Sequence, residues 1–93
     1  MTTDKLFKAI ERQTGITREQ IMSKSRKEEL VYARRIICYF LREEGASDKE
    51  IGCVLNRDRS TIQCYAQNHQ QEYKYNAKFR AIFDSINNTI NLI

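Results

Sequence analysis

The sequence contains no proline, only three glycines and a single histidine among its 93 residues. A chain so poor in helix-breaking residues is predicted to form helices joined by short turns, and no segment has the alternating pattern of a strand. Its three cysteines are an odd number without Cys-x-x-Cys spacing. That pattern argues against a disulfide framework or zinc site and favours reduced thiols in the cytoplasm.

Long apolar runs are also missing. None approaches the roughly 20 residues of a membrane-spanning helix, and the first five residues lack the core of a signal peptide. There is no Gly-x-x-x-x-Gly-Lys-Ser/Thr phosphate loop, no nucleophile–base set and no metal-ligand spacing. We therefore expect a cytoplasmic protein without a membrane partner, with no cofactor or metal and no enzymatic activity.

Charged residues make up 30% of the chain and hydrophobic residues 41%, the balance of a single globular domain spanning residues 1–93. The net charge is +4. Residues 18–42 carry seven Lys and Arg against three Glu, which leaves +4 in this segment alone. Such a concentration is compatible with nucleic-acid binding, although a charge run is more often a solvated face.

Residues 47–71 have the outline of a helix-turn-helix. Ser47 and Glu50 fit a capping box that starts one helix, and residues 56–58 (Asn-Arg-Asp) form a turn. A second helix then follows, with Ile62, Ala66, His69 and Tyr73 at helical spacing. It starts with polar residues that can bond base edges in the major groove: Asp58, Arg59, Ser60 and Thr61. The alternative is a polar cap on an ordinary core helix.

Four further helices are expected around this motif. The first begins at Thr3 or Asp4 and stops at Gly15, and a short second one starts with a capping box at Thr17. The longest spans residues 28–44, and Asn76 caps the last. The core-facing side chains recur at helical spacing: Leu30, Ala33, Ile36, Ile37, Phe40 and Leu41 in the longest helix, and Tyr75, Phe79, Ile82, Phe83, Ile86 and Ile90 in the last. The expected fold is all-α: six helices in a compact domain.

Residues 23–27 (Ser-Lys-Ser-Arg-Lys) are basic, polar and without periodicity, so they are predicted to form an exposed loop before the longest helix. This basic loop is either a solvated connection or an arm placed against phosphates or in a minor groove. On the longest helix, Arg35 and Arg42 are seven residues apart and share a face, with Arg34 between that face and the apolar arc.

Four short motifs, residues 23–27, 33–36, 50–52 and 57–62, occur in an order and approximate spacing that resembles the C-terminal DNA-binding domain of the bacterial replication initiator DnaA. The resemblance runs from about residue 6 to residue 90. It implies an all-helical fold in which a helix-turn-helix follows a long helix, and binding to short duplex boxes at replication origins.

The resemblance also implies roles for single residues. Arg26 corresponds to a minor-groove arginine, and Arg34 and Arg35 to contacts from the long helix to backbone or base. Asp58, Arg59 and Thr61 correspond to base-reading positions. The full set of predicted DNA-binding residues is Lys24, Ser25, Arg26, Lys27, Arg34, Arg35, Arg42, Arg57, Asp58, Arg59, Ser60 and Thr61.

The sequence departs from the family at several positions. Arg59 stands where a histidine is usual, Asn56 where a Gly-Gly or Gly-Lys pair is usual, and Cys64 with Tyr65 replaces His-Ala. Gln67 and Asn68 replace basic residues. These changes predict a different box or weaker binding, and they leave a second hypothesis: a protein-interaction module that retains the fold without the box contacts.

The expected partner is double-stranded DNA at the nucleoid, with protein partners of a replication initiator as a further option. Because the chain has no phosphate loop of its own, it is either a free-standing relative or one domain of a longer initiator. A free-standing copy would regulate transcription or compete with the initiator at its boxes.

Overall fold

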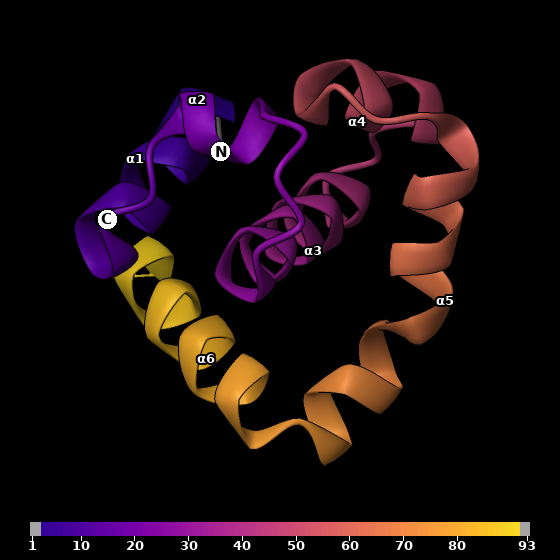
Figure 1. Ribbon diagram of the computed structural model, residues 1–93. Coiled ribbons are helices and arrows are strands. Elements are labelled where there is room, and N and C mark those ends of the chain that lie inside the picture. The colour runs from indigo at the N-terminus through magenta and orange to yellow at the C-terminus, as the bar shows by residue number, and fades with distance from the viewer. Residues whose placement is uncertain (1–2, 92–93) are drawn as a thin grey trace.

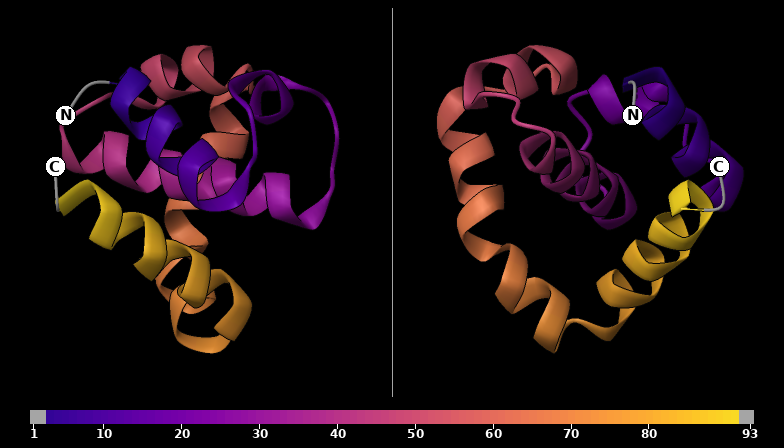
Figure 2. Two further views of the ribbon diagram at one scale, coloured as in Figure 1. Left: turned by 90° about the vertical axis from the view of Figure 1, so that its left-hand side faces the viewer. Right: turned by 180° about the vertical axis from the view of Figure 1, so that it is seen from behind.

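The computed structural model describes residues 3–91, and within this part of the chain every regular element is a helix. The helices are α1 (Thr3–Thr14), α2 (Arg18–Met22), α3 (Glu28–Glu43), α4 (Asp48–Leu55), α5 (Arg59–Tyr75) and α6 (Ala77–Asn91). α3 lies in the middle with the other helices around it, and α6 returns to pack on α1 (Figures 1 and 2). The predicted all-α, six-helix fold is confirmed.

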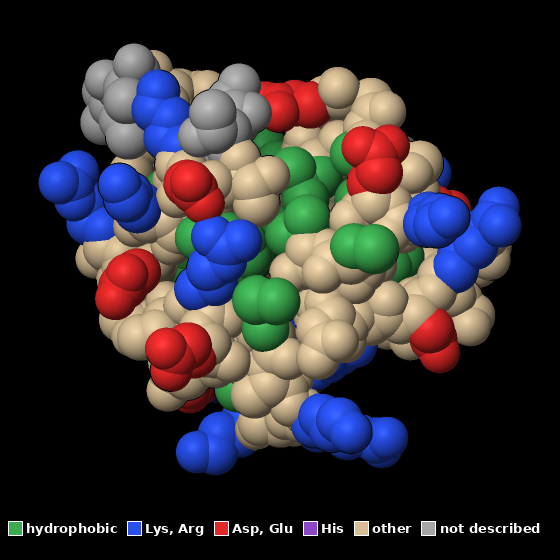
Figure 3. Space-filling view, turned by 90° about the horizontal axis from the view of Figure 1, so that it is seen from above, with side chains coloured by type: hydrophobic (Ala, Val, Ile, Leu, Met, Phe, Trp, Pro, Cys, Tyr) green, Lys and Arg blue, Asp and Glu red, His purple; other side chains and the backbone are tan. Residues whose placement is uncertain are grey.

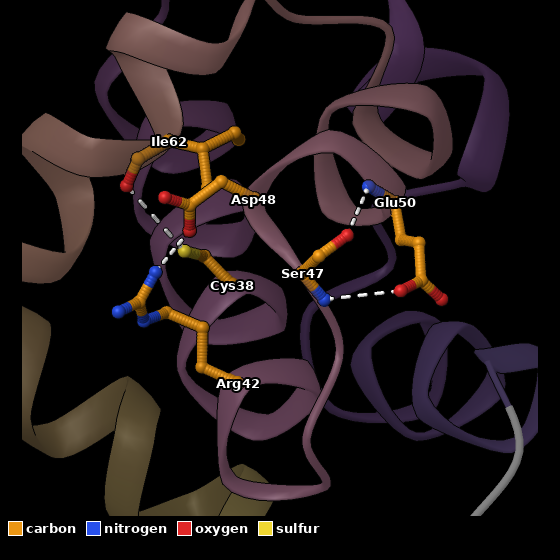
Figure 4. A network of polar contacts seen from close by, with 6 residues as sticks. All are labelled: Cys38, Arg42, Ser47, Asp48, Glu50 and Ile62. Carbon is orange, nitrogen blue, oxygen red and sulfur yellow. Dashed lines mark hydrogen bonds and ion pairs between the residues drawn. The ribbon is translucent and has the colours of Figure 1, made fainter.

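Local capping signals set most of the helix boundaries. Both predicted capping boxes form, at Thr17 before α2 and at Ser47 before α4. Figure 4 shows the second box, in which Ser47 and Glu50 bond each other's backbone N–H groups. Asn76 caps α6 by accepting a hydrogen bond from the backbone N–H of Phe79 at 3.1 Å. Each of these caps satisfies N–H groups that have no partner within their own helix.

α3 supplies the centre of the hydrophobic core. The apolar side chains predicted to face the core are all buried: Leu30, Ala33, Ile36, Ile37, Phe40 and Leu41. The predicted stripe of α6 also packs inward through Phe79, Phe83 and Ile86. Tyr75 is an exception, because it ends α5 and is 73% exposed, with the Lys74 ammonium 5.3 Å from its ring. The prediction that Tyr75 belongs to the core is therefore wrong.

The turn of the helix-turn-helix lies directly on α4. α4 ends at Leu55, and its C-cap residue Asn56 adopts a left-handed conformation with φ of 56°. A Cβ atom at Gly52 would lie only 2.6 Å from the backbone oxygen of Arg57, so this close approach requires glycine. α5 begins at Arg59, and Asp58 is its N-cap instead of its first helical residue. The helix continues to Tyr75, beyond the predicted end of the motif at residue 71.

Candidate nucleic-acid interface

The basic loop and the amino end of α5 line one groove. Loop residues Lys24 and Arg26 lie on one side of it, and Asp58 and Thr61 on the other. Tyr65, one turn further along α5, forms part of the wall. The structure thus brings together two segments, around residues 25 and 60, that the sequence analysis had singled out separately.

Asp58 holds the first turn of α5. One of its carboxylate oxygens, Oδ1, accepts hydrogen bonds from the Thr61 backbone N–H at 2.9 Å and the Ser60 hydroxyl at 3.4 Å. The hydrogen bonds from Thr61 lower the pKa of this exposed carboxyl, and the bond from Ser60 contributes in the same direction. Asp58 therefore remains ionised at neutral pH.

Four exposed cations of the basic loop and the start of α5 are free, and two of them, Lys24 and Arg26, line the groove. The side chains of Lys24, Arg26, Lys27 and Arg59 make no hydrogen bond or ion pair with any other residue between positions 3 and 91. Arg59 occupies the first position of α5, beside the turn. A free, solvated cation can bind a phosphate or a base edge without first breaking an internal contact.

Arg34 has a structural role that the sequence did not predict. Its side chain is only 2% exposed, and its guanidinium donates hydrogen bonds to backbone carbonyls of α2 and the basic loop. The acceptors are Ile21 at 2.6 Å, Ser25 at 2.7 Å, Ser23 at 2.8 Å and Gln20 at 3.4 Å. Burial lowers the pKa of Arg34, and the positive charge of Arg57 lowers it further. Most of its donors are thus used inside the protein, and the predicted DNA contact from Arg34, which borders the loop–α5 groove, stays a prediction.

Arg57 is also largely committed to internal contacts. It donates to the carbonyl of Asn56 at 2.8 Å, to that of Leu55 at 3.5 Å, and to the carbonyl of Ser23 in the basic loop. Arg57 therefore shares an acceptor with Arg34 and ties the turn of the helix-turn-helix to the loop. Arg57 precedes Asp58 and Arg59 in the sequence, but its guanidinium faces the loop backbone.

Arg35 and Arg42 do not line the loop–α5 groove. They line a second hollow between α3 and α5, together with Tyr39 and His69. The Arg35 guanidinium lies 5.1 Å from the centre of the Tyr65 ring, and its buried Nη1 has no hydrogen-bond partner in the described chain. Arg42 forms an ion pair with Asp48 at the start of α4 (Figure 4).

Tyr65 borders both hollows, a role that the sequence did not reveal. It stands where the resemblance leads one to expect alanine, and it is 8% exposed. Helical spacing from Ile62 identifies the buried face of α5, but not the cation–π contact with Arg35. Tyr65 is therefore a packing residue that also contributes to the wall of both hollows.

The face seen from above Figure 1, on the side of α2 and α4, has mixed charge. Figure 3 shows Lys and Arg around its edge, Asp and Glu between them, and hydrophobic side chains near its middle.

In residues 3–91, no cluster of three or more His, Cys, Asp or Glu is arranged to hold a metal ion. No helix in this range is both long and apolar enough to cross a membrane.

Comparison with known families agrees with this architecture. The sequence model described as "Bacterial dnaA protein helix-turn-helix" matches residues 3–68, from α1 into the middle of α5. No curated protein and no solved structure matches the chain. The matched part contains the basic loop, the long helix α3 and the helix-turn-helix, and the family is one of DNA-binding rather than catalytic domains. The chain belongs to the bacterial DnaA helix-turn-helix family.

Proposed function

We propose that the chain acts as one domain that binds double-stranded DNA sequence-specifically. The amino end of α5 enters the major groove, and the basic loop lies against the adjacent backbone and minor groove. The observation that supports this arrangement best is the groove shared by the loop and the start of α5, which the free cations Lys24 and Arg26 line. Lys27 and Arg59 are further free cations in the same two segments.

Base reading is assigned to the first turn of α5. Arg59 pairs with guanine O6 and N7, a bidentate contact that contributes about 1–3 kcal/mol of discrimination. The carboxylate of Asp58 accepts from a cytosine N4 amino group, and the Thr61 methyl group meets a thymine methyl. Ser60, whose hydroxyl donates to Asp58, helps to hold that carboxylate.

Register on the duplex is assigned to the loop and α3. Lys24, Arg26 and Lys27 bind phosphates or the minor-groove edge, and Ser25 shapes the loop by accepting a hydrogen bond from the Lys27 backbone N–H. Arg35, on α3 beside Tyr65 of α5, supplies positive charge toward the DNA backbone, although its Nη1 atom is buried. Arg42 is assigned a weaker phosphate contact, because it must first break its ion pair with Asp48.

In the cell, this activity corresponds to binding a replication-origin box or a regulatory site in the nucleoid, alongside protein partners of an initiator. The box need not be the one common in the family, because Arg59 stands where a histidine is usual.

The test is selection from a random duplex library at several salt concentrations. One enriched short motif is the expected result. Arg59→Ala should abolish preference at one or two positions of that motif while random duplexes are bound nearly as before. Arg12→Ala, which removes an exposed charge from the last turn of α1, is the matched control and should leave the motif unchanged. Absence of binding even at low salt would reject the proposal in favour of a protein-interaction module.

A further inference from the structure

The backbone carbonyls of α2 and the basic loop converge on side chains from two other elements. Arg34 of α3 donates to four of them, with its three shortest contacts at 2.6, 2.7 and 2.8 Å. Arg57 of the helix-turn-helix turn donates to Ser23, one of the same four. Asn56, also in the turn, donates to the carbonyl of Met22 at 3.3 Å. The start of the loop is thus held from both sides.

The turn that supplies two of these donors is itself fixed in place. Asn56 has a left-handed backbone, and the Arg57 backbone N–H donates to the carbonyl of Gly52 at 2.9 Å. The carbonyl oxygen of Arg57 also lies so close to Gly52 that a Cβ atom there would be only 2.6 Å away, so the turn packs directly against α4. A loop anchored to this turn is therefore anchored to α5, which begins two residues after Arg57.

At its ends the loop continues the neighbouring helices: the Ser23 hydroxyl donates to the carbonyl of Gln20 at 2.6 Å, and the Lys27 carbonyl accepts from the start of α3 at 3.0 Å. Between these ends the local backbone contacts are weak. Ser25 and Lys27 each donate their N–H group to a serine hydroxyl at 3.4 Å, near the limit of a hydrogen bond. The long-range hydrogen bonds from Arg34 and Arg57 thus contribute most of what fixes the loop relative to the rest of the molecule.

We propose that Arg34 and Arg57 are positioning residues, which hold the basic loop in register with α5 so that Arg26 and Arg59 meet the same duplex. This inference rests on the proposed DNA binding. Neither arginine needs to touch DNA. Instead, they order the loop in the free protein, so that DNA binding does not carry the entropic cost of ordering the loop.

Loop order in the free protein tests the contact without DNA. Arg57→Met removes the hydrogen bond from Arg57 to Ser23 while the buried Arg34 keeps its own, and Arg12→Met is a control with the same loss of charge. In Arg57→Met, backbone NMR order parameters of residues 24–27 should fall from near the rigid value of about 0.85 toward about 0.6, whereas those of α3 should not change. Unchanged loop order would overturn the proposal.

A double-mutant cycle on the selected duplex tests the consequence for binding. In the original protein, Arg26→Ala should weaken binding more strongly than it does in the Arg57→Met background, where the loop is no longer held. The expected non-additivity is about three- to tenfold in Kd. Arg12→Met should instead combine additively with Arg26→Ala. If the effects of Arg57→Met and Arg26→Ala on binding were also additive, the proposal would be overturned.

Arg57→Lys separates position from charge, because lysine keeps the charge but cannot reproduce the forked contacts. If Arg57 positions the loop, the Arg57→Lys variant behaves like Arg57→Met in the cycle; full rescue by lysine would show a charge effect and overturn the proposal. If no variant and not even the original protein binds DNA, while loop order still falls in Arg57→Met, then the proposed function fails. The role in DNA recognition fails with it, and only the structural contact remains.

Discussion

Replacing the buried Arg34 with methionine should strongly destabilise the domain. The change removes three hydrogen bonds of 2.6–2.8 Å from a charged donor and leaves their carbonyl acceptors without it. Hydrogen bonds to charged groups contribute about 1.5–3 kcal/mol each. Two effects offset part of this loss: the loop carbonyls can hydrogen-bond to water, and folding of the methionine variant does not require a charged group to be buried. We therefore expect a net loss of about 3 kcal/mol, out of the roughly 5–14 kcal/mol typical of a domain this size.

Arg42→Met is a matched control on the same helix. Arg42 is 43% exposed at its side chain and forms one ion pair, with Asp48. Exposed pairs of this kind contribute about 0.2–1 kcal/mol, so this variant should lose much less stability than Arg34→Met.

Thermal unfolding followed by circular dichroism measures both effects. For a domain of this size, about 4–8 °C in Tm corresponds to 1 kcal/mol, so Arg34→Met should lower Tm by roughly 12–24 °C. Arg34→Lys should also be destabilising, since one ammonium group cannot reach all the carbonyls. Equal Tm shifts for Arg34→Met and Arg42→Met would refute the assignment of Arg34 as the anchor of the loop.

Three other predictions use different observables. Burial, and then the charge of Arg35, lowers the pKa of His69 below its usual 6.5, so the unfolded chain binds the proton more readily. The free energy of unfolding should therefore fall as pH drops from about 7 to about 5. In His69→Gln, the free energy of unfolding measured by urea titrations should depend less steeply on pH, and an unaltered pH dependence would contradict this. Burial raises the pKa of Cys38 to about 11, whereas Cys53 and Cys64 are exposed, so a thiol reagent at pH 8 should label two cysteines quickly and Cys38 only on unfolding. Rapid labelling of all three thiols in the free protein would count against the structure. Bound duplex should shield Cys64, on α5, and rapid labelling of Cys64 in the complex would count against the docking. Finally, Lys24→Ala should weaken binding to every duplex and flatten the salt slope by about 0.9 if Lys24 binds one phosphate, and no change in slope would exclude that contact.

Much of the fold is predictable from the sequence because its signals are local. Capping boxes at Thr17 and Ser47, the stop at Gly15 and the apolar arc of α3 each depend on residues within one or two turns. Asp58 shows the limit of such signals, because the same residue fits an N-cap and a first helical position, and only the backbone geometry decides between them.

The interface is less accessible to sequence reasoning because it depends on contacts between distant residues. The helical wheel places Arg34 at the boundary between the polar and apolar faces of α3, which does not reveal that carbonyls of residues 20–25 cover it. The contact between Arg57 and Ser23 spans 34 positions. A list of basic residues therefore cannot distinguish a structural arginine from a free one, whereas their hydrogen-bond partners do.

The most direct test of the account is an NMR titration of the labelled domain with the duplex selected from the library. If one double helix contacts both the basic loop and the start of α5, amide signals of residues 24–27 and 58–62 should shift together, at the same DNA concentration. The amides of α1, on another side of the molecule, should shift far less. Shifts confined to one of the two segments, or centred on α1, would contradict the shared interface.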